Sequence, residues 1–91
     1  MNIHNTYTKT LTALNEKTIE YKIISEKFEN KTCYGIQVSE KSEKFSNSES
    51  IKNIYDSFEL VKKIALCLFE YSIDTSHFKD IVEDYITAMS R

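Results

Sequence analysis

The chain contains no proline, no tryptophan and a single glycine, Gly35. Its turns must therefore be formed by Asn, Asp, Ser and Lys, which mark the ends of helices and strands less sharply. One of the twelve basic residues is arginine, Arg91, and the net charge is −2. Arginine is the side chain that most often reads base edges, and a nearly balanced charge does not concentrate nucleic acid around a protein. We therefore expect no direct binding of DNA or RNA.

Long apolar runs are also missing from the sequence. No run approaches the roughly 18 apolar residues that a membrane-spanning helix needs, and the first residues do not have the pattern of an export signal. The two cysteines, Cys33 and Cys67, are far apart and form no C-x-x-C motif. Such cysteine usage is typical of a reducing compartment. We therefore expect a cytoplasmic protein without a membrane anchor and without a disulfide.

The length of 91 residues, with 41% hydrophobic and 29% charged residues, leaves room for one small core and not for a two-domain enzyme. Residues 1–17 combine a strand-like alternation of threonines with Tyr7, Leu11 and Leu14 at helical spacing. Because these two periods conflict, we expect this segment to be a flexible or conditionally ordered N-terminal tail. Residues 18–91 are expected to form a single α+β domain.

Two runs of alternating apolar and polar residues predict a β-hairpin over residues 18–40. A two-residue turn at Asn30 and Lys31 would place Ile23 opposite Val38. The apolar side chains expected on one face of this hairpin are those of Ile19, Tyr21, Ile23, Tyr34, Ile36 and Val38.

Gly35 falls on the opposite face of this hairpin. There it is either a weak point of the strand or a place where another backbone comes close. Residues 41–50 are rich in serine and charge, which is typical of a connection, and residues 51–55 predict a short third strand.

The C-terminal half has two helical patterns. Asp56 and Glu59 form a start that resembles a capping box, which predicts a helix over residues 57–71. A second helix is expected after Asp74, where apolar residues recur at helical spacing up to the C-terminus. The elements together predict an α+β fold, in which an antiparallel hairpin or three-stranded sheet precedes two antiparallel helices in the order β-β-β-α-α.

The first of these helices is apolar around almost its whole surface. The sheet and the second helix can bury two of its sides, so Leu66 and Phe69, next to Lys62 and Lys63, are the candidate partner-binding residues. The alternative is that the N-terminal tail covers this side of the helix with its three large apolar residues.

An acidic face on the second helix is the one candidate metal site. His77 aligns with Asp80 and Asp84, and Glu83 lies beside them, so one nitrogen and two carboxylates share a helix face. A solvated acidic face is the commoner reason for such a pattern, and no nucleophile is spaced beside His77. We therefore expect no metal, no cofactor and no catalytic residue.

Three segments form a recognisable pattern, namely Tyr34-Gly35-Ile36, residues 51–59 and residues 76–86. Together they resemble a family of short uncharacterised proteins from anaerobic, spore-forming, low-GC bacteria. The resemblance spans residues 18–88. It implies a cytoplasmic bacterial module and no functional residues, because that family has no assigned activity.

The expected function is that of a small, non-enzymatic regulatory or accessory protein. It would bind a protein partner, with a second copy of itself as one candidate, through the apolar helix face or a free sheet edge. The alternative is an accessory factor for DNA-acting machinery, such as a recombinase or a transcription regulator of a mobile element or a sporulation programme.

Overall fold

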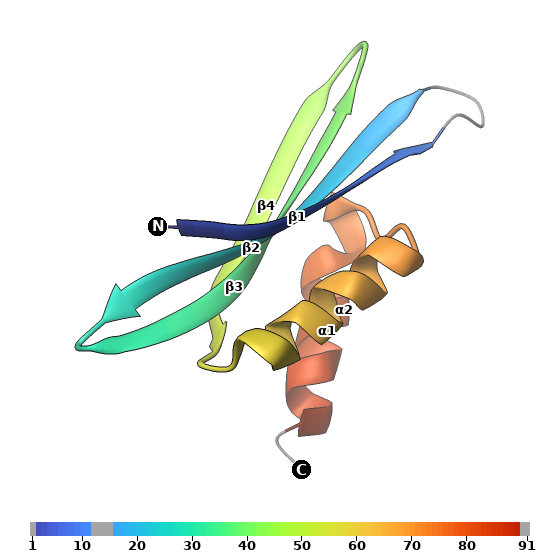
Figure 1. Cartoon of the computed structure of the whole chain (residues 1–91). Helices are drawn as coiled ribbons and strands as arrows, with labels where there is room; N and C mark the ends of the chain where they lie inside the picture. The colour runs from blue at the N-terminus through green and yellow to red at the C-terminus, as the bar shows by residue number, and fades with distance from the viewer. Residues whose placement is uncertain (1, 12–15, 90–91) are drawn as a thin grey trace.

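A computed structural model describes residues 2–11 and 16–89 of the chain. Four strands form one antiparallel sheet in the order β1-β2-β3-β4, and two helices follow (Figure 1). The elements are β1 (Asn2–Leu11), β2 (Lys17–Phe28), β3 (Lys31–Ser42), β4 (Ser46–Tyr55), α1 (Phe58–Glu70) and α2 (Thr75–Met89). The α+β class is confirmed, but the sheet has four strands where the sequence predicted two or three.

The hairpin of β2 and β3 has the buried face that the alternation predicted, although its register differs by two residues. The turn consists of Glu29 and Asn30, whose φ angles of 48° and 69° are the left-handed values typical of a two-residue hairpin turn. Ile23 therefore lies opposite Ile36 and not opposite Val38. Because a shift of two residues keeps every side chain on its own face, the predicted buried face is preserved.

The N-terminal segment contributes β1, an edge strand that pairs with β2 over its whole length. The expectation of a tail over residues 1–17 thus missed a strand of the same sheet. Tyr7 and Leu11 pack against the core, while Leu14, the third apolar residue of the expected cover, lies outside the described residues. One irregularity interrupts the pairing, a β-bulge between Ile3 and Asn5.

β4 begins earlier than the sequence predicted, because the serine-rich segment from Ser46 is already paired with β3. Its pairing is interrupted opposite Gly35, where the register shifts between Tyr34 and Ile36. A Cβ atom on Gly35 would collide with the carbonyl oxygen of Ile51 and lie 2.9 Å from the Cα of Lys52. Only glycine fits at position 35, because the β4 backbone passes close to it. Of the two interpretations of Gly35, the close approach of another backbone is therefore the one that the structure shows.

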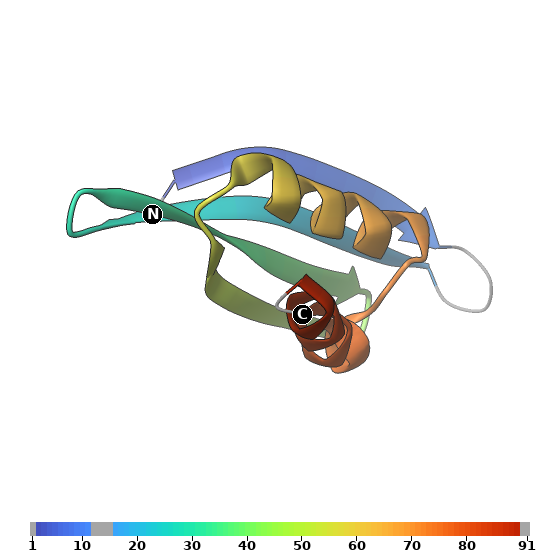
Figure 2. The same ribbon diagram turned by 90° about the horizontal axis from the view of Figure 1, so that it is seen from below.

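Both helices cover the same face of the sheet (Figure 2). α1 begins after Ser57, whose hydroxyl accepts a hydrogen bond from the Leu60 N–H. The helices cross each other and are not antiparallel neighbours, since Figure 2 shows α1 lengthwise and α2 nearly end-on. The core residues that join helices and sheet are Ile19, Tyr21, Ile23, Ile36, Val38, Val61, Ile64, Ala65, Leu68, Phe78 and Val82.

Within the described residues, neither helix has the length and the apolar composition that crossing a membrane requires.

Candidate protein-interaction site

β1 leaves one long backbone edge of the sheet unpaired among the described residues. It pairs with β2 on one side, and no other described strand lies on its second side. In an antiparallel strand, every second residue directs its N–H and C=O to the unpaired side. The side chains of Thr6, Thr8 and Thr10 are exposed on the sheet face that the helices leave open. Because β-branched threonine favours extended backbone, this edge is held in a conformation that another strand can join.

Lys9 does not protect this edge, although it is the one Lys, Arg, Asp or Glu residue of β1. Its Nζ donates hydrogen bonds to the Phe69 carbonyl oxygen at 2.5 Å and to the Ser72 hydroxyl at 3.0 Å. The same ammonium group lies 4.7 Å from the centre of the Phe69 ring. The positive charge thus satisfies carbonyls at the C-terminal end of α1, where a cation is favourable, and is directed away from the free edge.

The opposite edge of the sheet, formed by β4, is protected from pairing with another chain. β4 is bent at Asn53, whose φ is 56°, and its register is broken there. It also carries two ion pairs, between Lys52 and Glu26 at 3.3 Å and between Glu49 and Lys79 at 3.1 Å. Bulges and charged side chains are features that keep an edge strand from pairing with another chain. Of the two edges, β1 is therefore the one open to a partner.

The predicted partner-binding residues of α1 fall into two groups. Leu66 is 38% exposed, Lys63 is exposed and Lys62 is half-buried. Phe69 is half-buried, with its ring centre 5.9 Å from that of Tyr7 and beneath the ammonium of Lys9. The structure therefore gives no single exposed patch that includes Phe69, because β1 covers that part of α1.

Leu66 and Lys62 lie on the flank of α1 that faces β1. The ring of Phe58 lies 5.9 Å from that of His4, and Phe69 contacts Tyr7, so both ends of this flank touch β1. Residues spaced by four and three share a helix face, which places Lys62 and Leu66 between these two contacts. The free edge of β1 and this flank of α1 are thus adjacent, and we call them together the β1 surface.

A second exposed group lies where the two helices meet. Tyr71 is 69% exposed, and Tyr85 on α2 is also exposed. The Tyr85 hydroxyl lies 2.6 Å from the Sγ of Cys67, and this hydrogen bond raises the pKa of Tyr85. Because tyrosine and cysteine satisfy each other here, the group links α1 to α2.

His4 and Ser25 form a pair that the sequence pattern gave no reason to expect. The His4 Nε2 lies 2.7 Å from the Ser25 hydroxyl, because the bulge after Ile3 turns the ring to the helix side of the sheet. The ring also makes edge contacts with Tyr34 and Phe58. Ser25 is only 4% exposed, so the pair links β1 to a buried position of β2.

The candidate metal ligands on the acidic face of α2 are not grouped together among the described residues. His77 hydrogen-bonds to Asp74 at 2.8 Å, and the side chains of Asp80, Glu83 and Asp84 are exposed. Within residues 2–11 and 16–89, no group of three His, Cys, Asp or Glu residues is placed to hold a metal ion.

A family model matches residues 1–88 of this chain, and its description is a family of unknown function, DUF6514. The chain belongs to this family. No curated protein and no solved structure matches the chain. The family match includes β1 and the rest of the sheet, whereas the resemblance noted in the sequence began at residue 18.

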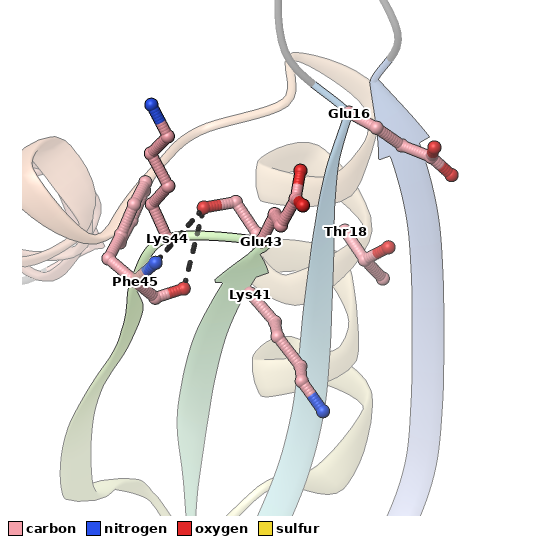
Figure 3. A pocket seen from close by; sticks show the side chains of 7 residues that line it. Glu16, Thr18, Lys41, Glu43, Lys44 and Phe45 are labelled. Atoms are coloured by element: carbon pink, nitrogen blue, oxygen red, sulfur yellow. Dashed lines mark hydrogen bonds between the residues drawn. The ribbon is translucent and has the colours of Figure 1, made fainter.

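One hollow of the described surface lies beside the hairpin of β3 and β4 and extends to the start of β2 (Figure 3). Its volume is about 560 Å³. The lining side chains are those of Glu16, Thr18, Lys41, Ser42, Glu43, Lys44 and Phe45. Two lysines and two glutamates balance each other, and most of these side chains are exposed. The hollow therefore offers no selective charge and no enclosed apolar wall to a small molecule.

Proposed function

We propose that this chain is a small, non-enzymatic regulatory or accessory protein that works by binding a protein partner at the β1 surface. The observation that carries the proposal is the free edge of β1, whose one strongly charged side chain, Lys9, is held against the end of α1. The resemblance to short proteins of spore-forming bacteria makes a bacterial cytoplasm part of the proposal.

The free edge supplies affinity of a general kind. Main-chain N–H and C=O groups can pair with any extended segment, so the hydrogen bonds alone do not select a partner. Selection would come from side chains beside the edge, and Leu66 and Lys62 on α1 provide an apolar and a cationic contact there. The exposed apolar contact favours an extended partner segment that also carries apolar side chains.

Co-purification from the native host cell tests the proposal. Tagged wild type is compared with a variant carrying Thr6→Lys, Thr8→Lys and Thr10→Lys, which places charge along the free edge as natural edge strands do. The matched control carries Ser46→Lys, Ser48→Lys and Ser50→Lys, three exposed substitutions at the opposite edge. We expect a specific protein to be recovered with the wild type and with the β4 control, and to be lost with the β1 variant.

The variant Leu66→Glu tests the contribution of the α1 flank to binding, separately from that of the β1 edge. Because Leu66 is exposed, the substitution is expected to leave the fold intact and to reduce recovery of a partner that also contacts α1. Equal recovery of every protein with all four chains, at unchanged melting temperatures, would show that the β1 surface is not the binding site.

A further inference from the structure

We infer that the partner of the β1 edge is a second copy of this chain, paired through residues Asn5–Leu11 in antiparallel orientation about a two-fold axis at Thr8. This inference rests on the proposed function and names the partner for its strand edge. The result would be a continuous eight-stranded sheet, since each copy contributes four strands.

The position of the axis follows from the regular part of β1. The bulge between Ile3 and Asn5 interrupts the strand near its start, whereas the pairing from Asn5 to Leu11 proceeds without a shift. Thr8 is the middle residue of this regular run. An axis there lets the whole run of one copy pair with the whole run of the other.

The charge pattern agrees with this register. With the axis at Thr8, Lys9 faces Tyr7 of the second copy, and Thr6 faces Thr10. No charged side chains of the same sign are then opposite each other, which would be unfavourable across a strand pair. An axis at Lys9 would instead place the two Lys9 residues, which carry the same charge, directly opposite each other.

The faces of the two sheets also match. Directly opposed residues in an antiparallel pair lie on the same face of the sheet. The odd-numbered residues Tyr7, Lys9 and Leu11 are the less exposed ones, on the helix side, and the exposed threonines are on the other. Pairing about Thr8 therefore joins odd with odd and even with even, so the helices of both copies lie on one side of the joined sheet.

The asymmetry between the two edges determines that the assembly is a closed dimer. β4 carries the break at Asn53 and the charges of Lys52 and Glu49, so it does not offer a second edge for strand addition. A chain with one usable edge forms a two-fold pair and stops, whereas two usable edges would give a growing filament.

Substitutions that introduce charge on either side of the proposed two-fold axis test the inference. In the register proposed, Lys at positions 6, 8 and 10 creates three opposed like-charge pairs in the dimer, and Glu at the same positions does so as well. We expect the wild type to sediment as a dimer and the Thr6/Thr8/Thr10→Lys and →Glu variants to sediment as monomers. Three such pairs should raise the dissociation constant by about tenfold or more. A mixture of the two variants should form mixed dimers in native mass spectrometry.

The Ser46/Ser48/Ser50→Lys chain is the matched control and should remain a dimer, because its charges lie at the other edge. Circular dichroism melting curves must show that every variant is folded. The inference is overturned if the wild type is a monomer at millimolar concentration or if the Lys or the Glu variant alone still dimerises. It is also overturned if the two variants are folded but form no mixed dimers.

The failure of this inference differs from the failure of the proposed function. A monomeric wild type whose co-purifying protein is lost on substitution at Thr6, Thr8 and Thr10 overturns the self-pairing and supports the function. In the other case, the wild type is a dimer, but the same substitutions do not change which proteins co-purify. This result supports the self-pairing and overturns the binding of another protein at the β1 surface.

Discussion

Glu40 on β3 caps α2 through Thr75, the first residue of that helix. The Thr75 N–H donates to Oε1 of Glu40 at 3.1 Å, and the Thr75 hydroxyl donates to Oε2 at 3.2 Å. The first N–H groups of a helix lack partners within the helix, and the helix dipole favours a negative charge there. The Nζ of Lys17 lies 3.6 Å from the same carboxylate. The sheet thus holds the start of α2 through Glu40.

Replacing Glu40 should therefore destabilise the whole fold. Glu40 is 5% exposed, and Glu40→Ala leaves the buried N–H and hydroxyl of Thr75 without their acceptor. We expect a loss of about 2–3 kcal/mol in the free energy of unfolding, measured by urea denaturation. Glu49→Ala is the control, because its ion pair with Lys79 is exposed and should contribute less than about 1 kcal/mol. Equal effects of the two substitutions would contradict this role of Glu40.

Tyr21 should make the protein sensitive to alkaline conditions. Its hydroxyl donates to the Ile73 carbonyl at 2.8 Å, and burial, with the nearby negative charges of Glu40 and Asp74, raises its pKa far above the ordinary 10.0. The unfolded chain then loses this proton first, so the stabilisation is complete below pH 10.0 and declines as the pH rises above it.

Tyr21→Phe tests this account. The substitution should cost about 1 kcal/mol at neutral pH, because the Ile73 carbonyl loses its donor. Urea denaturation above pH 10.0 should then show a smaller difference between wild type and variant. A difference that stays constant with pH would exclude Tyr21 as the source of the alkaline sensitivity.

Asp74 should have the opposite pH dependence. Burial alone would raise its pKa, but hydrogen bonds from Ser76 and His77 outweigh that effect and lower the pKa below 3.8. Its carboxylate accepts the His77 N–H at 3.1 Å as the N-cap of α2. The unfolded chain takes up the proton first, so the stabilisation is present above pH 3.8 and is lost as the pH falls through the lowered pKa.

The corresponding measurement compares Asp74→Ala with Asp74→Asn. At neutral pH we expect Asp74→Ala to lose about 1 kcal/mol, and Asp74→Asn to lose less because asparagine also caps helices. Urea denaturation well below pH 3.8 should bring the wild type close to Asp74→Asn. If the wild type keeps its full advantage in acid, the carboxylate charge of Asp74 does not stabilise the fold.

The sequence predicted well those elements that bury an apolar face. Ile19, Tyr21 and Ile23 are buried as expected, and α1 and α2 begin close to the predicted positions. The strand β1 escaped prediction for a physical reason. It lies at a sheet edge, and threonines occupy its exposed face. Lys9 lies on the face that contacts the helices, and its charge is accommodated there because it donates a hydrogen bond to a carbonyl at the end of α1.

The candidate site was predicted only in part, because its composition depends on the contact between β1 and α1 in the folded chain. The helical pattern placed Leu66 and Phe69 together as apolar residues, and only the position of Tyr7 on β1 separates the exposed one from the covered one. The pair of His4 and Ser25 depends on a bulge, and no spacing in the sequence indicates it.

Gly35→Ala should destabilise the sheet, although alanine normally stabilises a strand relative to glycine. The added Cβ would meet the Ile51 carbonyl and the Lys52 Cα, both of which are backbone atoms that cannot turn aside. We expect a loss of about 1–3 kcal/mol in the free energy of unfolding. Gln37→Ala, on the same strand and face, should change it by less than about 1 kcal/mol. A more stable Gly35→Ala chain in thermal denaturation would mean that β4 does not cross over Gly35.

Leu66 and Phe69 should respond differently to substitution, because β1 covers one of them and not the other. Phe69→Ala removes the ring that lies beside Tyr7 and beneath Lys9, and the expected loss is about 2–3 kcal/mol, at or below the lower end of the range for fully buried aromatic residues. Leu66→Ala exposes little new surface and should cost less than about 0.5 kcal/mol.

Hydrogen exchange of β1 amides distinguishes this from a general loss of stability. If Phe69 holds β1 through Tyr7 and Lys9, then Phe69→Ala should accelerate exchange in β1 more than in β3, whereas Leu66→Ala should leave both unchanged. A uniform acceleration in Phe69→Ala would mean that β1 does not depend on this ring. A local acceleration in β1 shows that the strand proposed to bind a partner is itself held in place by α1.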